Sequence, residues 1–393
     1  MNSGLLDSKT VDVRDKMNNK DFEEKLASFE KKIWNKKIYV FGAGSLGKYV
    51  YDLMKEDGIS GFIDNSEEKQ KQGFFNKKVF ALEEVLEKKE EIFVIIAVAE
   101  RHYKEVYQQL NRQLGKEALM NYTVFIPLYL FFVKKTLLFT RVSVSITQKC
   151  TLNCKDCSIM TPYLKEKKHY ALEKMQKDLD MMFEKIDCLG GIIILGGEPF
   201  LYPHLKEYLL YLDKYQDKIL RKPTIVTNGT VIPNEDVLEV LERRQIEVSI
   251  SDYRVALPWI KEKVDKLVQV LKNHNINYVV DTPETWFDFG YTTADKYQLS
   301  EEEMSRFFDA CKMPCRLLRD GKIYYCANAQ FACDAGIMQE DIENEMDLSK
   351  VSNPLDIIKF DQGYNARGYL NLCRQCNGYI TINKNEVPIA EQV

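Results

Sequence analysis

The sequence lacks any apolar run of the roughly 20 residues that a membrane-spanning helix needs. The nearest candidate, residues 125–139, is interrupted by Pro127 and by Lys134, so it indicates a buried connector. The basic start and apolar stretch of a secretory leader are also absent, since Asp7 and Asp12 come early. We therefore expect a cytoplasmic protein without a membrane span.

A strong excess of charge of one sign is missing as well. The chain carries 55 Lys and Arg against 59 Asp and Glu, a net charge of −4. A protein that neutralises a phosphate backbone needs a basic surface, so nucleic-acid binding is not expected. Internal repeats and low-complexity tracts are absent too. With 393 residues, 45% of them hydrophobic, the chain is long enough for two or three domains.

Cysteine, by contrast, is plentiful and clustered. A reducing compartment disfavours structural disulfides, so the spacing of the ten cysteines matters more than their number. Three lie within residues 150–157, six lie between residues 311 and 376, and Cys188 stands alone. This clustering indicates metal ligation at two places.

Alternating apolar and helical stretches predict an α/β fold with several parts. Residues 1–36 are polar, with a helix expected over 22–34. Strands at 38–41, 60–64 and 93–98, separated by helical stretches, predict a Rossmann-like parallel sheet at 37–125. A linker is expected at 126–140. Further strands, which predict a partial (β/α)6 TIM-like barrel over 141–305, are expected at 141–146, 191–195, 224–226, 247–250 and 278–280.

The remaining residues, 306–393, break this alternation and predict a C-terminal extension. Ser300 and Glu303 resemble a capping box for a helix that begins after Ser300 and runs into the extension. Asp320 and Gly321 lie in the middle of residues 317–325, a pattern typical of a β-hairpin. An irregular acidic stretch is expected after the hairpin.

The first cysteine group has the spacing Cys-x₃-Cys-x₂-Cys, at Cys150, Cys154 and Cys157, directly after a predicted strand. Three thiolates can hold three irons of a [4Fe–4S] cluster and leave the fourth iron open to a ligand. A zinc ion is the alternative, but structural zinc takes four ligands, and only His169 is a conceivable fourth.

A second motif, Gly196-Gly197-Glu198-Pro199, follows the next strand. Paired glycines allow the backbone to approach a ligand closely, and Glu198 can accept a hydrogen bond from an ammonium group. A tight strand-to-loop turn is the structural alternative. Together the cysteine and glycine motifs resemble the radical S-adenosylmethionine (SAM) superfamily over residues 141–305.

That resemblance implies roles for particular residues. The three cysteines would hold a [4Fe–4S] cluster that binds SAM, and Gly196, Gly197 and Glu198 would hold its methionyl amine. Residues at the ends of the next strands would meet the ribose; they are Thr227, Asn228, Ser249 and Ser251. Asp156 departs from the pattern, since many members have an aromatic residue there, near adenine. Segments 251–254 and 286–290 are expected at the barrel mouth, although Trp286 equally suits plain core.

The later cysteines resemble the twitch, or abbreviated SPASM, extension of radical SAM enzymes. This implies one auxiliary [4Fe–4S] cluster held by Cys315, Cys326, Cys373 and Cys376, with Cys311 as the substitute for Cys315. A four-cysteine zinc ribbon is the alternative.

A glycine loop near the start forms another candidate site. Gly42, Gly44 and Gly47 lie between a strand and a helix, with Asp64 at the end of the next strand. Such a loop presents backbone N–H groups to a phosphate. The segment resembles the amino-terminal Rossmann-like domain of bacterial sugar acyltransferases, which implies a nucleotide-sugar, or NAD, as ligand. A docking module without a ligand is the alternative.

Together these expectations predict an enzyme that cleaves SAM to a 5′-deoxyadenosyl radical. The radical would abstract hydrogen from a sugar or nucleotide-sugar. The outcome is oxidation or epimerisation, with Cys333 as a candidate hydrogen donor. An external electron donor such as flavodoxin or ferredoxin is implied. A peptide-modifying maturase and a zinc-bound, nucleotide-sugar-binding scaffold are the alternatives.

Overall fold

The structure is a computed structural model that describes residues 29–393 except 32, 34, 55–57, 89, 292–297, 312, 314, 380 and 381. The chain divides into two compact units after Leu137. Most of the helix expected over 22–34 lies outside the described residues. Phe29, from its last part, is buried, and its ring centroid lies 5.5 Å from that of Phe125.

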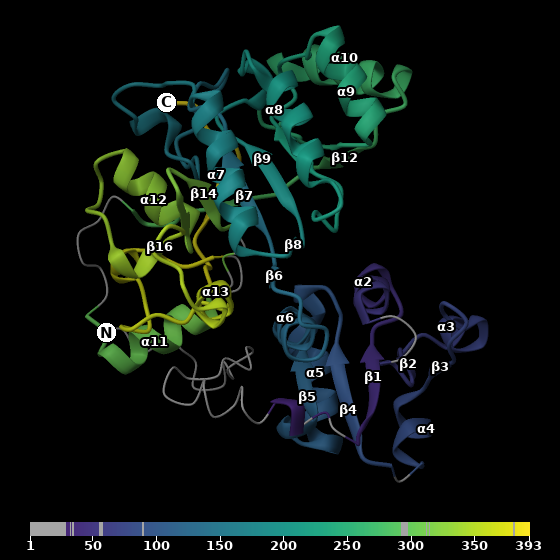
Figure 1. The fold of residues 1–393 in the computed structure, drawn as a ribbon. Coiled ribbons are helices and arrows are strands. Elements are labelled where there is room, and N and C mark those ends of the chain that lie inside the picture. The colour runs from purple at the N-terminus through teal and green to yellow at the C-terminus, as the bar shows by residue number, and fades with distance from the viewer. Residues whose placement is uncertain are drawn as a thin grey trace. The chain divides into compact units, whose positions relative to one another are not determined.

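The first unit is a five-stranded parallel sheet in the order β3-β2-β1-β4-β5 (Figure 1). Its central strands read as continuous apolar runs because helices cover both faces of such a sheet. The chain order reverses between β1 and β4, as in Rossmann folds. The strands are β1 (Lys37–Phe41), β2 (Gly61–Ile63), β3 (Val79–Phe80), β4 (Ile92–Ile96) and β5 (Leu119–Asn121). The helices are α2 (Ser45–Met54), α3 (Glu67–Gln72), α4 (Leu82–Leu86), α5 (Glu100–Leu114) and α6 (Tyr122–Phe132).

The expected linker at 126–140 differs from the structure in its first half. Residues up to Phe132 belong to α6, which contains Pro127 and continues the first unit. Asn121 caps this helix by accepting a hydrogen bond from the backbone N–H of Thr123 at 2.9 Å. Six consecutive α6 residues are buried, so the apolar character that suggested a connector in fact reflects helix packing.

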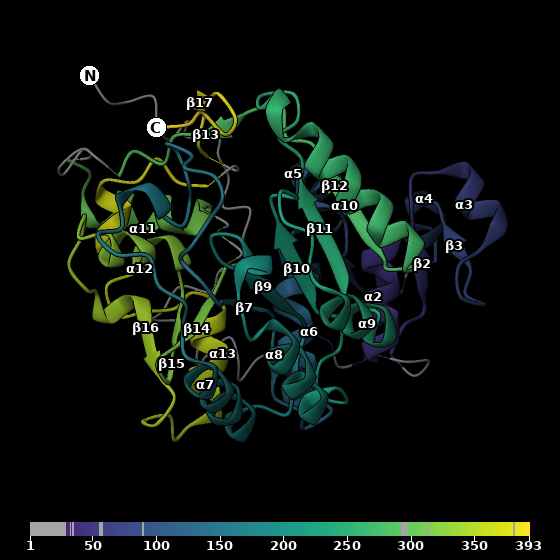
Figure 2. The same cartoon turned by 90° about the horizontal axis from the view of Figure 1, so that it is seen from above.

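The second unit is built on five parallel strands in the order β12-β11-β10-β9-β7. They are β7 (Val142–Ser145), β9 (Ile192–Leu195), β10 (Thr224–Thr227), β11 (Glu247–Ser251) and β12 (Tyr278–Asp281). The intervening helices are α7 (Leu172–Lys185), α8 (Leu205–Tyr211), α9 (Glu235–Arg244) and α10 (Lys261–Asn273). Figure 2 shows α9 and α10 on the same side of the sheet. The arrangement is a partial TIM-like barrel.

With one strand of the C-terminal extension that pairs parallel to β7, the sheet contains six parallel strands within the described residues. After β12 the chain forms β13 (Trp286–Phe287), which pairs with β17 (Glu386–Val387) and not with the barrel sheet. A small parallel pair, β6 (Leu138–Phe139) with β8 (Cys188–Leu189), lies apart from both sheets.

The C-terminal extension continues the barrel sheet on its other side. β14 (Leu317–Arg319) runs parallel to β7, and β15 (Lys322–Tyr324) and β16 (Glu345–Asp347) follow in antiparallel order. The hairpin turn is the predicted one, with Asp320 and Gly321 at φ 54° and 74°. Core and extension therefore share one compact unit, and the boundary at 305/306 stays a prediction.

Helices complete the extension: α11 (Glu301–Ala310), α12 (Ala327–Asp334) and α13 (Pro354–Asp361). The Ser300–Glu303 capping box of α11 is confirmed, since each side chain bonds the other's backbone N–H. The irregular acidic stretch expected after the hairpin is found at residues 335–344, which contain only turns and one short 3-10 helix. It is shorter than the sequence suggested, because α12 precedes it and β16 follows it.

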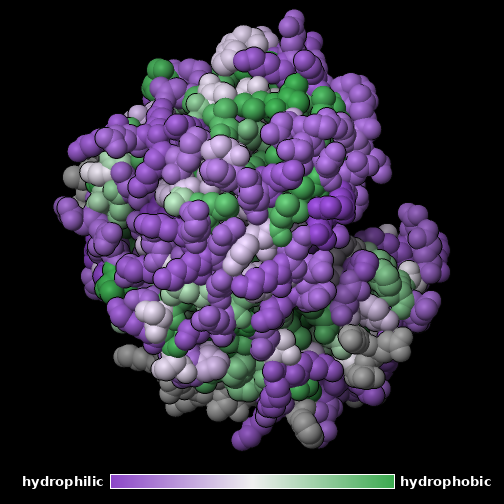
Figure 3. Space-filling view, turned by 45° about the horizontal axis from the view of Figure 1, so that its top comes forward, coloured by the Kyte–Doolittle hydropathy of each residue, from purple (hydrophilic) through white to green (hydrophobic). Residues whose placement is uncertain are grey.

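On the face drawn in Figure 3, hydrophilic side chains predominate and apolar ones form scattered patches. No helix within the described ranges is long and apolar enough to span a membrane.

Candidate active site

A loop after β7 carries the first three thiols, Cys150, Cys154 and Cys157. Burial raises the pKa of Cys150 to about 11 and that of Cys154 to about 12, and the neighbouring thiols raise both values further. The three thiols are therefore within electrostatic reach of one another. The loop that carries them lies at the carboxyl end of a barrel strand, where active sites of such folds lie.

Hydrogen-bond donors point at two of these sulfurs. The backbone N–H of Leu152 and the side-chain amide of Asn228 each lie 3.4 Å from the Cys150 sulfur. The side-chain amide of Gln392 lies 3.1 Å from the Cys154 sulfur. N–H groups aimed at sulfur stabilise a thiolate, which is the form that binds iron.

Within the part of the chain that the structure describes, no group of three or more Cys, His, Asp or Glu side chains is placed to hold a metal ion. The thiolates of a [4Fe–4S] cluster bind different irons. A cluster at these three thiols therefore stays a prediction from their spacing. The conceivable zinc ligand, His169, instead places Nδ1 2.9 Å from the hydroxyl of Thr147.

The glycine pair after β9 packs directly against the cysteine loop. A Cβ on Gly197 would lie 2.2 Å from the Lys149 carbonyl oxygen, and one on Gly196 would lie 2.6 Å from that of Thr147. The backbone N–H groups of Gly197 and Glu198 donate to the same two carbonyls, each at 2.8 Å. The glycines are therefore required by the close approach of two loops, whatever they also do toward a ligand.

Glu198 is fully buried and links the glycine motif to the end of β10. Its carboxylate accepts hydrogen bonds from the Thr227 hydroxyl at 2.8 and 2.9 Å and from the Asn228 N–H at 2.9 Å. The Phe200 N–H donates to it at 3.1 Å. Burial raises the pKa of Glu198 to about 7. In this structure the carboxylate is occupied by these internal donors, and its contact with an ammonium group stays a prediction.

Thr227 and Asn228, expected to meet the ribose, are part of the same framework. The Asn228 amide donates to Thr151 at 3.2 Å as well as to the Cys150 sulfur. Its oxygen accepts from the Thr230 N–H at 3.0 Å. Asn228 therefore holds the β10 loop against the cysteine loop, a role that the sequence did not indicate.

The end of β11 brings a phenol to the thiols. Ser249 and Ser251 lie on the half-buried face of β11, and Ser251 hydrogen-bonds Tyr253. Burial raises the pKa of Tyr253, and all three thiols of the loop raise it further. The Tyr253 ring meets Trp286 edge-on at 5.3 Å between centroids. Both residues therefore belong to the surroundings of the thiols.

A second group of thiols lines a cavity in the extension. Its four cysteines come from three separate segments of the chain. Burial raises the pKa of Cys376, and the other three thiols raise it further. The remaining lining is apolar and aromatic, including Tyr291, whose pKa the nearby thiols also raise. The four cysteines are Cys311, Cys326, Cys373 and Cys376.

Of the two alternatives for the fourth cysteine, the structure brings Cys311 to the cavity. Cys311 ends α11 and lines the space with the others. Cys315 is partly buried and does not line this cavity, and the guanidinium groups of Arg141 and Arg316 lower its pKa against the raising effect of burial. The structure therefore favours Cys311 over the preferred Cys315, and the ligand role of either stays a prediction.

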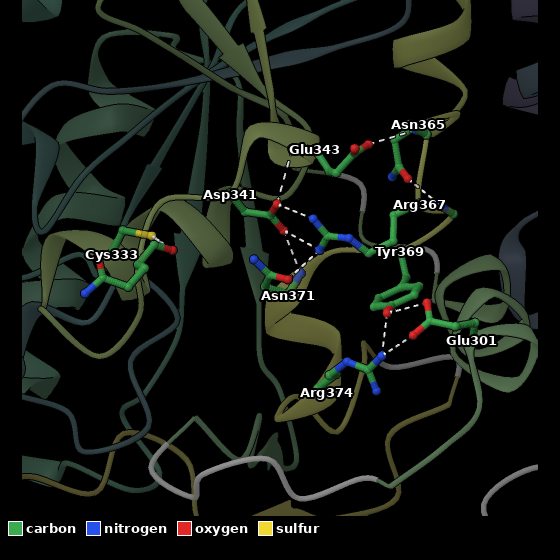
Figure 4. Close-up of polar contacts among 12 residues, drawn as sticks. Glu301, Cys333, Asp341, Glu343, Asn365, Arg367, Tyr369, Asn371 and Arg374 are labelled. Atoms are coloured by element: carbon green, nitrogen blue, oxygen red, sulfur yellow. Dashed lines mark hydrogen bonds and ion pairs between the residues drawn. The ribbon is translucent and has the colours of Figure 1, made fainter.

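Polar contacts tie the segment that carries Cys373 to α11 (Figure 4). Glu301 accepts from the Tyr369 hydroxyl and from Arg374, each at 2.6 Å. Nearby, Asp341 accepts from the Asn371 N–H at 2.6 Å and pairs with Arg367 at 3.1 Å. These contacts hold two cysteine-bearing segments together.

Two cysteines lie outside both groups. Cys188 is buried in β8. Cys333 is on α12, where its thiol donates to the Gln339 carbonyl at 3.2 Å, and Figure 4 shows it apart from the labelled polar contacts. Burial raises its pKa to about 11. The structure thus does not bring Cys333 to either thiol group, and its role as hydrogen donor stays a prediction.

In the first unit, the glycine loop is shaped largely by packing. A Cβ on Gly42 would lie 2.4 Å from the Ala97 carbonyl oxygen, and one on Gly47 would lie 2.0 Å from that of Gly42. Gly44, in contrast, faces open space. Asp64 accepts from the Ala43 N–H at 2.9 Å and from Lys69 at 2.8 Å. Gly44 is thus the position with room for a ligand.

Sequence reasoning missed Gln392 and underrated Tyr253. Neither residue belongs to a motif, and Gln392 is 238 positions from the cysteine that it contacts. The segment 251–254 was marked only as part of the mouth, with no indication that its phenol faces the thiols.

Comparison with solved structures finds similar folds at low identity. BtrN in complex with AdoMet and 2-DOIA has 16% identity, covers 65% of this chain and 99% of its own, and gives a TM-score of 0.38. SuiB of Streptococcus suis bound to S-adenosylmethionine has 14% identity, 72% and 84% coverage, and a TM-score of 0.34. Native anSMEcpe with bound AdoMet has 11% identity, 57% and 83% coverage, and a TM-score of 0.41. These likenesses are too low to carry an argument about function.

No curated protein matches this chain in sequence. Two family models do match parts of it. Residues 37–110 match the PglD N-terminal domain, and residues 144–293 match the radical SAM superfamily. The second match spans β7 to β13 and so includes both the thiol loop and the glycine motif. The chain therefore carries a radical SAM domain, preceded by a domain of the PglD N-terminal kind.

Proposed function

We propose that the second unit is an enzyme that binds a [4Fe–4S] cluster through Cys150, Cys154 and Cys157 and uses it to cleave SAM. One observation carries this proposal: the three-thiol loop after β7 packs against the Gly196–Gly197 turn, and N–H donors reach two of its sulfurs, those of Cys150 and Cys154. When bound, the cluster and SAM together supply a 5′-deoxyadenosyl radical that abstracts a hydrogen atom from an unactivated C–H bond.

The chain's own residues prepare the site for this chemistry. N–H groups from Leu152, Asn228 and Gln392 stabilise negative charge on the sulfurs. The buried Glu198 fixes the β10 end against the glycine motif, so the walls of the site are rigid before a ligand enters. The rings of Tyr253 and Trp286 add apolar surface that excludes water from a reactive intermediate.

We further propose that the four-thiol cavity holds one auxiliary [4Fe–4S] cluster. Cys311, Cys326, Cys373 and Cys376 line one cavity with an apolar wall, and each would supply one thiolate. The backbone N–H groups of Asn328 and Ala329, at the start of α12, lower the pKa of the Cys326 thiol against the effect of burial. Such a cluster would accept an electron from a substrate radical, which suits oxidation without an external oxidant.

The proposed substrate is a sugar or nucleotide-sugar, which is oxidised or epimerised. The domain of the PglD N-terminal kind supports this choice, because the first unit resembles the Rossmann-like domain of sugar acyltransferases. A peptide substrate is the second candidate. SuiB has been solved with its precursor peptide SuiA, and it covers 77% of this chain at 12% identity and a TM-score of 0.31.

Anaerobic reconstitution tests the central proposal. We expect about eight irons per chain, as two clusters require, and 5′-deoxyadenosine formed from SAM under a flavodoxin or dithionite reductant. Zinc in place of iron, with no SAM cleavage, would refute the enzyme and favour a zinc-bound scaffold. Product analysis with candidate sugars and peptides then separates the two substrate classes.

Calorimetric titration tests the first unit. We expect binding of a UDP-sugar or NAD at the loop that contains Gly44. A Gly44→Val variant should lose binding without loss of stability, since its side chain would fill open space. Absence of binding for every nucleotide tried would favour a docking module.

A further inference from the structure

Residues 386–393 form a strap that joins two parts of the barrel mouth. At its start, β17 pairs with β13, the strand that carries Trp286. At its end, Gln392 forms a β-bridge with Cys154. Between them Ile389 and Ala390 are buried, 9% and 0% exposed, so the strap is anchored on both sides of a packed centre. In Figure 2 the C label lies beside β13 and β17.

Backbone bonds fix the strap along the cysteine loop. The Lys155 N–H donates to the Glu391 carbonyl at 2.7 Å, and the Val393 N–H donates to the Asn153 carbonyl at 3.0 Å. A salt bridge between the Lys155 and Glu391 side chains, 3.3 Å long, lies on the exposed side, with both side chains about half exposed. An exposed pair contributes little, so the backbone bonds and the Gln392 side chain carry the attachment.

The Gln392 amide has only one orientation that satisfies its neighbours. Its oxygen accepts from the Asn153 N–H at 2.8 Å, a group that can only donate. The amide nitrogen must then face the other way, where the Ala390 carbonyl lies at 2.7 Å and the Cys154 sulfur at 3.1 Å. The two amide hydrogens match these two acceptors, so an N–H of Gln392 points at the sulfur.

We propose that Gln392 is a positioning residue that sets the reduction potential of the cluster held by Cys150, Cys154 and Cys157. This inference rests on the proposed function. The N–H donated to the Cys154 thiolate stabilises the more negatively charged, reduced cluster more than the oxidised one. Gln392 therefore makes one-electron reduction by the external electron donor easier. The strap holds the Gln392 N–H in place beside the Cys154 sulfur.

Two variants separate the hydrogen bond from the rest of the strap. Gln392→Glu keeps an oxygen for the Asn153 N–H and replaces the donor with an acceptor that faces the sulfur. Gln392→Leu removes all three side-chain hydrogen bonds at similar size. Glu391→Gln is the matched control, because it removes the Lys155 salt bridge one residue away and leaves the backbone bond in place.

Potentiometric titration with dithionite, followed by electron paramagnetic resonance, is the main measurement. At fixed potential, we expect Gln392→Glu and Gln392→Leu to lower the ratio of reduced to oxidised SAM-binding cluster roughly fivefold, as loss of one charge-assisted hydrogen bond predicts. The auxiliary cluster's signal is the internal reference and should not shift. Glu391→Gln should titrate like the unaltered protein.

A second readout needs no cluster. In the apo-protein, amide hydrogen exchange at Asn153 and Lys155 should be faster in Gln392→Leu than in Glu391→Gln, because the strap loses its side-chain anchor. Unshifted titrations in both Gln392 variants, with the unaltered protein loaded and cleaving SAM, would overturn this inference alone. Failure of the unaltered protein to bind iron would instead overturn the proposed function.

Discussion

The Thr227 hydroxyl lies 2.8 and 2.9 Å from the two carboxylate oxygens of Glu198, a residue with no exposed surface. This contact joins the end of β10 to the glycine motif after β9. Asn228, the next residue, extends the link to the Cys150 sulfur at 3.4 Å. One buried carboxylate thus holds together two loops that come from different strands and meet at the thiols.

The raised pKa of Glu198 predicts a particular pH dependence of stability. Its folded value is about 7, above the ordinary 4.5, so the unfolded chain loses this proton first as the pH rises. The free energy of unfolding should therefore fall between pH 4.5 and 7, by up to about 3 kcal/mol, and this contribution should level off above pH 7.

Glu198→Gln mimics the protonated form and should flatten that part of the profile. Urea unfolding of the reduced apo-protein at a series of pH values, for both proteins, measures the difference. Other carboxyl groups affect both proteins alike and cancel. Parallel profiles would contradict the buried, raised carboxyl group.

Gly197→Ala should destabilise the second unit. The added Cβ would lie 2.2 Å from the Lys149 carbonyl oxygen and 2.9 Å from the Cβ of Cys150, so the cysteine loop must move. We expect a loss of about 1–3 kcal/mol together with weaker iron retention. Gly191→Ala is the control, since its nearest atom, Cβ of Arg221, lies at 3.9 Å. Thermal unfolding of the two variants should differ; equal melting temperatures would show that the loop adapts freely.

Cys311→Ala and Cys315→Ala should separate the two alternative ligands. Because Cys311 lines the four-thiol cavity and Cys315 lies beside Arg316, only the first substitution should lower iron from about eight to about four per chain. Iron analysis after reconstitution is the measurement. SAM cleavage should persist in both, as it should in Cys373→Ala. If Cys315→Ala is the variant that loses iron, the cavity assignment is wrong.

Cys150→Ala should abolish SAM cleavage, since it removes one of three thiolates from the proposed SAM-binding cluster. Formation of 5′-deoxyadenosine under dithionite is the assay. Equal loss of cleavage in Cys150→Ala and Cys373→Ala, with both proteins folded by circular dichroism, would argue against two separable clusters.

Cys333→Ala should leave both iron content and SAM cleavage unchanged. Its thiol, on α12, donates to the carbonyl of Gln339, which follows that helix, and lies outside both thiol groups. If Cys333 is the hydrogen donor of an epimerisation, the variant should still consume substrate but return an altered product ratio. Loss of iron would instead identify it as a ligand.

Local sequence determined the elements and the first site. The buried strand β4 is an apolar run because both faces of a parallel sheet are covered. The Ser300 capping box and the Asp320–Gly321 turn could be predicted from the sequence because each depends on a few neighbouring residues. The cysteine motif could be recognised for the same reason, since its three residues lie on one loop.

Tertiary structure decided whatever depends on residues distant in the chain. Cys311 rather than Cys315 reaches the cavity because α11 ends there and Cys315 leads into β14 beside β7. Residues 286–287 pair with β17, and the sixth parallel strand of the barrel sheet is β14, which lies beside β7. Gln392 meets Cys154 because a packed strap brings it there, and no local pattern specifies a contact across 238 positions. The sequence by itself thus determined which residues have the chemistry, and packing decided which of them meet.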